Sequence, residues 1–157
     1  MREYKFLDTD PMGFGWEEYD IVGEDHAELI RTCCKYSKTV SFAIGIDKWS
    51  LIEKLEAYRI PKDNNITFIS PVSWRNGIPD EIRYYRVCPE LCELLIQYVD
   101  NIWDWLFANP EDPIFYRADG SVFFKSRIHD GWCILTPRDD ENVDHIVKKA
   151  HWLKIKG

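Results

Sequence analysis

Carboxylates are the reactive side chains that this sequence concentrates most, and they gather near the N terminus. Between Lys5 and Arg31 the chain contains no Lys or Arg, and its acidic residues there are Asp8, Asp10, Glu17, Glu18, Asp20, Glu24, Asp25 and Glu28. Such a cluster attracts cations, and aromatic residues interleaved with it can anchor a protein interface. The pattern predicts a docking surface for a basic protein partner, with contact residues Trp16, Glu17, Glu18, Tyr19, Asp20 and Glu24. A solvated acidic surface that also caps two helices would explain the same charges without a partner.

A second group of side chains, between residues 114 and 135, is cationic and aromatic instead. Alternation along the predicted strands places the group on one face, and its members are Tyr116, Lys125, Arg127, His129 and Trp132. Two basic residues beside three rings could hold an anionic substrate. The alternative function is therefore a small enzyme or ligand-binding protein with an anion pocket on residues 114–135. Without a ligand, covering elements would bury the rings while Lys125 and Arg127 extend their charged ends to water.

The remaining groups that could do chemistry match no metal site or catalytic arrangement. Asp8-Thr9-Asp10 lacks the Gly and the terminal Glu of an EF-hand loop. The contiguous pair Cys33-Cys34 departs from the spacing of structural zinc ligands, even with Cys88 and Cys92 added. The sequence contains no GxGxxG, P-loop or GxSxG motif. We therefore expect no metal, no cofactor and no catalytic residue, and a binding protein is favoured over an enzyme.

Composition limits the class of partner and the compartment. The chain has 27 acidic and 20 basic residues, a net charge of −7, whereas binding to a phosphate backbone depends on Lys and Arg. Nucleic acid is therefore not an expected partner. No apolar stretch approaches the length of a membrane span and no signal peptide opens the chain, so we expect a cytoplasmic protein with no membrane contact. Five irregularly spaced cysteines indicate reduced, mostly buried thiols.

The elements that position these residues are clearest between Ile114 and Leu135. Two Asp-Gly dipeptides, at 119–120 and 130–131, separate three short β-favouring runs, which predicts a three-stranded meander with two-residue type I′ turns. Alternation assigns one face to the core, with Phe115, Val122, Phe124, Ile128, Cys133 and Leu135. Phe123 and Ile134 fall on the cationic face.

The rest of the chain predicts helices and strands in clusters. Helical periodicity and capping residues indicate helices that begin near Asp25, Asp47, Pro89 and Asp139, and the third continues to Asn109 with a polar stripe of acids and amides. Strands are expected at 3–7, 16–22, 39–44, 66–69 and 82–87, and a tight turn at Asn76-Gly77. The chain is thus predicted to be a single α+β domain over residues 1–157. Its mixed, mainly antiparallel sheet would be packed by about four helices.

These features favour an acidic binding protein that masks a basic partner. In size, acidic composition and lack of a catalytic motif, the chain resembles the small immunity proteins that bacteria make beside polymorphic or contact-dependent toxins. The resemblance implies inhibition of a basic toxin domain by steric and electrostatic blockade. A third possibility is a stable homo-oligomer whose interface buries the surplus aromatic residues.

Overall fold

The computed structural model describes residues 2–9, 18–45, 50–62, 65–66, 74–75, 78–79, 81–106 and 109–157. The strands are β1 (Glu3–Leu7), β2 (Thr39–Ile44), β3 (Arg59–Ile60), β4 (Trp74–Arg75), β5 (Ile78–Pro79), β6 (Glu81–Arg86), β7 (Glu111–Tyr116), β8 (Val122–Arg127), β9 (Trp132–Leu135) and β10 (Leu153–Lys156). The helices are α1 (Gly23–Tyr36), α2 (Ser50–Leu55), α3 (Pro89–Tyr98), α4 (Asp144–Val147) and the 3₁₀ turns η1 (Glu56–Tyr58) and η2 (Ile102–Asp104).

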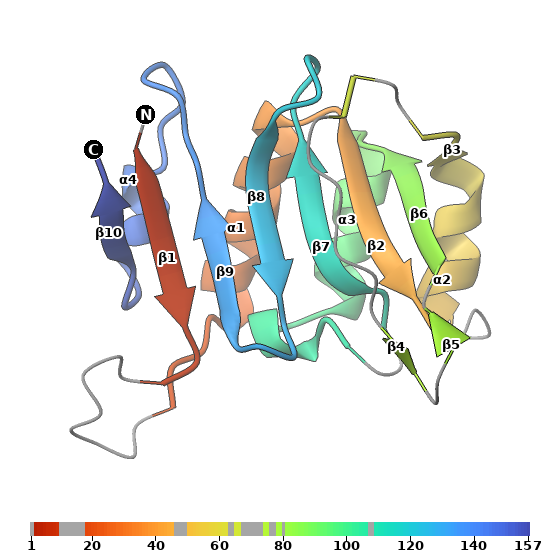
Figure 1. The fold of residues 1–157 in the computed structure, drawn as a ribbon, viewed down its shortest axis with the longest axis horizontal. Coiled ribbons are helices and arrows are strands. Elements are labelled where there is room, and N and C mark those ends of the chain that lie inside the picture. Colours follow the sequence, from red (N-terminus) through yellow and green to blue (C-terminus); the bar gives the residue numbers. More distant parts are fainter. Residues whose placement is uncertain are drawn as a thin grey trace.

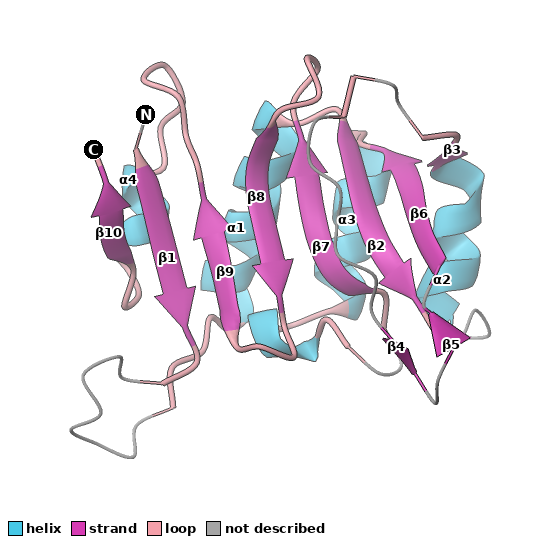
Figure 2. Ribbon diagram, viewed as in Figure 1, coloured by secondary structure: helices cyan, strands magenta, loops and turns pink. Residues whose placement is uncertain are grey.

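One large antiparallel sheet organises the molecule. Its eight strands have the order β10-β1-β9-β8-β7-β2-β6-β3, and β4 and β5 form a separate two-stranded ribbon. The helices lie together on one face of the large sheet (Figures 1 and 2). The prediction of an α+β domain with a mainly antiparallel sheet and a C-terminal meander is confirmed, because β7, β8 and β9 pair in sequence order.

Both meander turns differ from the predicted two-residue form. Gly120 and Gly131 have positive φ angles of 87° and 73°, but neither preceding aspartate does. Each glycine instead closes a four-residue turn, with its N–H donating to the carbonyl of Arg117 (2.9 Å) or Ile128 (3.0 Å). The Asp-Gly pairs thus mark the turns correctly, while the left-handed conformation is confined to the glycine of each pair.

A β-bulge changes the predicted faces of the meander. Phe115 pairs with Phe124 and Tyr116 with Val122, so Phe123 is an extra residue on β8. Phe123 therefore joins Phe124 in the core between sheet and helices, contrary to the prediction. Val122 packs on the opposite side of the sheet, also contrary to the prediction. The other predicted core residues of the meander lie in the helix-side core as expected: Phe115, Ile128, Cys133 and Leu135.

Several predicted boundaries are wrong. α1 begins at Gly23 without a side-chain cap, so Asp25 and Glu28 form no capping box. α3 begins at Pro89 as predicted but ends at Tyr98, because the backbone becomes extended at Val99. The last helix, α4, has four residues, and β10 follows it, although no strand was predicted there.

Other predictions fall partly or wholly outside the described residues. In the predicted strand 16–22, residues 18–22 contribute only isolated bridges, from Glu18 to Thr9 and from Val22 to Asn101. The predicted cap Asp47, most of the strand 66–69 and the turn Asn76-Gly77 lie outside the described part of the chain. Strands 39–44 and 82–87 correspond to β2 and, with a shift of one residue, to β6.

Candidate partner-binding site

The acidic residues converge because two distant segments pair beside the N-terminal end of α1. Gly23 donates its N–H to the Asp100 carbonyl (2.9 Å), and Ile102 donates to the Ile21 carbonyl (3.0 Å). An antiparallel bridge joins Val22 to Asn101 between them. This pairing brings the segment after α3 against residues 18–22, so acids that a continuous helix would separate from Asp20 lie close to it.

Buried side chains hold the segment that follows α3 against α1. The indole N–H of Trp105 donates to Nε2 of His26 (3.0 Å), and both side chains are almost fully buried. Burial lowers the pKa of His26 to about 4, against opposing effects of the Asp100 charge and a hydrogen bond to the Val99 carbonyl. The imidazole is therefore neutral at pH 7, so it can accept the indole hydrogen bond and hold the chain immediately after η2.

The residues that follow β1 bind both the second meander turn and the segment around Tyr19. Beyond β1, Asp8 donates its N–H to the Gly131 carbonyl (3.0 Å), and its own carbonyl accepts from the Tyr19 N–H (2.7 Å). A Cβ atom on Gly131 would lie 2.4 Å from a carboxylate oxygen of Asp8, closer than side chains pack. The second meander turn thus favours glycine for its positive φ, and a larger residue there would also require the Asp8 carboxylate to move.

These elements enclose a groove of about 240 Å³, which we call the acidic groove. Its lining residues are Asp8, Thr9, Glu18, Tyr19, Asp20, Trp103, Leu106 and Ile128. The volume is below the range of about 300–1,000 Å³ that is typical of small-molecule sites. A single inserted side chain of a partner protein suits this space better than a cofactor.

Two aromatic side chains stiffen the groove. The Trp103 indole donates to the Tyr19 carbonyl (2.6 Å), and its ring stacks on Phe6 with centroids 5.9 Å apart. The Tyr19 ring stacks on His151 at 3.8 Å with an interplanar angle of 8°. Both rings are half-buried. They offer fixed apolar surface beside the carboxylates, which is the combination that anchors protein interfaces.

Charge accumulates at the groove without compensation. Partial burial raises the pKa of Asp20, and the neighbouring charges of Asp104 and Asp100 raise it further, against hydrogen bonds from the Ile21 and Ile102 N–H groups. Within the described part of the chain, no Lys or Arg forms an ion pair with Asp8, Glu18, Asp20, Asp100 or Asp104. The site would therefore gain from a cation that enters it.

The predicted contact residues separate into three groups. Glu18, Tyr19 and Asp20 line the acidic groove. Glu24 lies on α1, where it is bound to Arg31 at 2.7 Å, so it is not a groove residue. Trp16 and Glu17 lie outside the described residues.

The sequence prediction missed Trp103, which lines the groove, and the two aspartates whose charges act on Asp20. Asp100 and Asp104 were assigned to the polar stripe of a helix that in fact ends at Tyr98, and Trp103 was not singled out. The β-branched and short polar residues from Val99 to Ile102 are poor helix formers and could have indicated this end.

The alternative residues on the meander differ in burial and take part in separate contacts. Tyr116 is fully buried in a cluster with Ile66, Tyr84 and Ile114, and its hydroxyl is hydrogen-bonded to that of Ser41 (3.0 Å), so its side chain is not exposed beside the other four. The remaining four lie nearer the surface in local pairings. Arg127 pairs with Asp130 (3.5 Å), His129 approaches Glu111 (3.3 Å), Trp132 lies under Lys5, and Lys125 is opposite Ile134.

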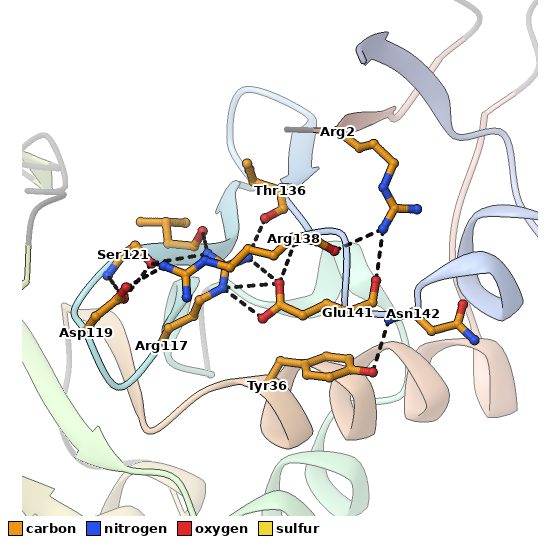
Figure 3. Close-up of polar contacts among 10 residues, drawn as sticks. Arg2, Tyr36, Arg117, Asp119, Ser121, Thr136, Arg138, Glu141 and Asn142 are labelled. Carbon is orange, nitrogen blue, oxygen red and sulfur yellow. Dashed lines mark hydrogen bonds and ion pairs between the residues drawn. The ribbon is translucent and has the colours of Figure 1, made fainter.

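A third polar cluster joins the first meander turn to the loop after β9 (Figure 3). Arg117 donates through Nε to both carboxylate oxygens of Glu141 (3.2 and 2.9 Å) and through a terminal nitrogen to one of them (2.6 Å). Its other hydrogen bonds go to Ser121 and to the carbonyls of Val122 and Thr136. The side chains of Arg117 and Glu141 are 4% and 9% exposed. Each guanidinium nitrogen of Arg117 already donates to an acceptor within the chain, so this pair holds the loops together and is not a ligand site.

No group of three or more His, Cys, Asp or Glu side chains converges to hold a metal ion in the ranges that the structure describes. Among the same residues, no helix has the length and apolar character needed to cross a membrane. Comparisons with protein-family models, with curated proteins and with solved structures find no match to this chain.

Proposed function

We propose that this protein is a binding protein that inhibits a basic protein partner, and that the acidic groove receives a Lys or Arg side chain of that partner. The observation that carries the proposal is the convergence of Asp20, Asp100 and Asp104 from separate segments, beside two fixed rings. A bacterial toxin domain with a basic active cleft is the class of partner that this chemistry fits.

Electrostatic attraction would speed the encounter with a basic partner and favour that partner over acidic proteins. A net charge of −7 attracts a basic protein at long range, and the uncompensated groove directs it to one surface. An inserted guanidinium or ammonium would offset the repulsion among the three aspartates, so Asp20 would lose its raised pKa on binding. Binding would accordingly release protons, and affinity should weaken as the pH falls toward the ordinary carboxyl range.

Inhibition would follow from occupancy alone. The groove is lined by Asp8 and Thr9 after β1, by Ile128 of the β8–β9 turn and by Trp103 of η2, so a partner side chain inside it would hold the partner's basic surface against this protein. Basic residues of a toxin that normally hold an anionic substrate would instead face the carboxylates. The mechanism needs no bond formation and no cofactor.

Co-purification from the native host followed by charge reversal tests the proposal. A single stoichiometric basic protein should be retained, and its association rate should fall as salt rises. The double variant Glu18→Lys, Asp104→Lys should slow association about tenfold or more at low salt while leaving the fold intact. Coexpression of wild-type protein should protect cells from the partner, whereas coexpression of the variant should not.

The matched control is Glu53→Lys, Asp139→Lys, which changes the net charge equally at exposed positions away from the groove. Equal losses of association in both double variants would show that net charge, and not the groove, attracts the partner. Retention of no protein, or of further copies of this chain alone, would overturn the inhibitor proposal. In those cases small anions should be tested against the Lys125 and Arg127 face.

A further inference from the structure

A second groove, of about 380 Å³, lies where the end of α1 meets the start of α3. Its lining residues are Arg31, Cys34, Lys35, Ser37, Lys38, Val87, Cys88, Pro89, Cys92 and Glu93. Cys34 is eleven residues beyond Gly23, which places it about 16 Å along α1 from the acidic groove at 1.5 Å per residue. The two sites are therefore separate.

Two thiols from different helices meet in this groove. Cys34 on α1 and Cys92 in the first turns of α3 both line the groove, and α1 and α3 pack against each other. Cys34 is half-buried, whereas Cys92 is only 7% exposed and reaches the groove through the part of its side chain that lines it. The third thiol, Cys88, occupies the N-cap position of α3, and its carbonyl accepts the Cys92 N–H (3.0 Å).

The two thiols differ in their tendency to ionise. The hydrogen bond from Cys34 lowers the pKa of Cys92, and the Arg31 charge lowers it further, against burial and the Glu93 charge. The same hydrogen bond, with burial, raises the pKa of Cys34. Cys92 is thus the thiol of the pair that is favoured as a thiolate, and the thiolate is the nucleophilic form of cysteine.

The other buried thiols provide an internal contrast. Burial raises the pKa of both Cys33 and Cys133, and both side chains are fully enclosed in the helix-side core. Neither thiol lines the groove. They serve as small apolar core residues, so the chemistry of Cys34 and Cys92 does not follow from cysteine content alone.

The groove also carries groups that suit a small polar oxidant. Arg31, Lys35 and Lys38 line it, and their N–H groups are hydrogen-bond donors. Ser37 lines it too, and the buried Ser37 hydroxyl has no hydrogen-bond partner among the described residues. These donors could bind the oxygen that leaves when a peroxide is attacked.

We propose that Cys34 and Cys92 form a redox-active dithiol that a hydroperoxide converts to an intramolecular disulfide. The Cys92 thiolate attacks one oxygen of hydrogen peroxide, the O–O bond breaks, and the departing hydroxide takes a proton to become water. Cys34 then attacks the resulting sulfenic sulfur, the S–O bond breaks, and a second water leaves with the thiol proton. In total, two thiols are oxidised and one peroxide is reduced to two waters. A dithiol reductant reverses the reaction by exchange.

Limited oxidation of the intact, folded protein tests this proposal. Hydrogen peroxide should remove two hydrogen atoms from the mass of wild-type protein, and non-reducing peptide mapping should join Cys34 to Cys92. Dithiothreitol should restore the original mass. Because mapping uses the wild-type chain, this result does not depend on whether a cysteine variant folds.

Three variants assign the roles. Cys34→Ser should allow a sulfenic acid to accumulate on Cys92, trapped by dimedone as a single adduct, whereas Cys92→Ser should slow peroxide consumption about tenfold or more. Cys88→Ser is the matched control in the same groove and should still form the Cys34–Cys92 bond. A disulfide that uses Cys88, a disulfide that persists in Cys92→Ser, or wild-type thiols that stay reduced until the protein unfolds would each overturn the proposal.

Discussion

Two regions of this molecule, the Arg117–Glu141 cluster and the acidic groove, differ in how their charges are balanced. In the Arg117–Glu141 cluster, a buried cation meets a buried anion, and the carboxylate is also held by the Arg138 N–H at 2.7 Å (Figure 3). In the acidic groove, by contrast, Asp20 lies near two further aspartates, and no described Lys or Arg pairs with them. One region has its counterion inside the chain, and the other would obtain it from a partner.

The pKa directions express this difference. Burial opposes ionisation of Glu141, but the hydrogen bonds from Arg117 and Arg138 outweigh it and lower the pKa of the carboxyl. Partial burial and like charges instead raise the pKa of Asp20. The carboxylate form of Glu141 therefore stabilises the fold, whereas the carboxylate form of Asp20 destabilises it. A site that weakens its own fold is typical of surfaces that are completed by binding.

The largest expected effect comes from breaking the internal pair. Glu141→Gln should lower the free energy of unfolding by about 3–5 kcal/mol, because it leaves Arg117 buried and charged without a carboxylate. Urea denaturation followed by tryptophan fluorescence would measure the loss. Partner affinity per folded molecule should be unchanged, since neither residue touches the acidic groove.

Asp119→Asn is the matched control for that variant. It removes an exposed carboxylate from the same cluster, where Asp119 forms an ion pair with Arg138 and accepts a hydrogen bond from the Ser121 hydroxyl. The free energy of unfolding should change little, because exposed ion pairs contribute little to stability. If Asp119→Asn proved as damaging as Glu141→Gln, the buried pair would not be the element that stabilises these loops.

A smaller effect on the free energy of unfolding is expected from protonation of His26. This side chain differs from Arg117 and Glu141 because its burial is not offset by an oppositely charged group in direct contact. Its folded pKa of about 4 lies below the unfolded value of 6.5, so the unfolded chain binds a proton first as the pH falls. Stability should be fully present above pH 6.5 and decline by about 3 kcal/mol as the pH falls to about 4. Denaturation curves across this pH range would measure the decline.

The variant His26→Gln isolates that contribution. Its amide can accept the Trp105 N–H and donate to the Val99 carbonyl, but it does not titrate. The decline of stability between pH 6.5 and 4 should become shallower in the variant. An unchanged pH slope would mean that other groups, and not the support beneath the groove, govern stability in this range.

Local patterns predicted much of the sheet but only one of the two acidic segments that meet at the groove. The β-branched run 39–44 and the Asp-Gly turns fix β2 and the meander, because they act through strand propensity and glycine conformation. The end of α3 depends on pairing with residues 21–23, and helical periodicity continues past it, so Asp100 and Asp104 were placed on the wrong element. The extra residue Phe123 and the exposed edge strand β10 likewise depend on their neighbouring strands.

The smallest effect on stability is also the sharpest test of the comparison. Asp20→Asn keeps a side-chain oxygen to accept the Ile21 N–H (2.7 Å) but removes one of the like charges. We expect the free energy of unfolding at pH 7 to rise by about a few tenths of a kcal/mol, because the exposed position screens the gain, while partner association slows. In the wild type, stability should increase as the pH falls through the raised folded pKa of Asp20, above 3.8, and the variant should lack this component.

The control Glu53→Gln, at an exposed position on α2, should alter neither the free energy of unfolding nor the rate of partner association. A loss of stability in Asp20→Asn with unchanged association would make Asp20 a structural residue, and the acidic groove would then belong with the Arg117–Glu141 cluster and not in contrast to it.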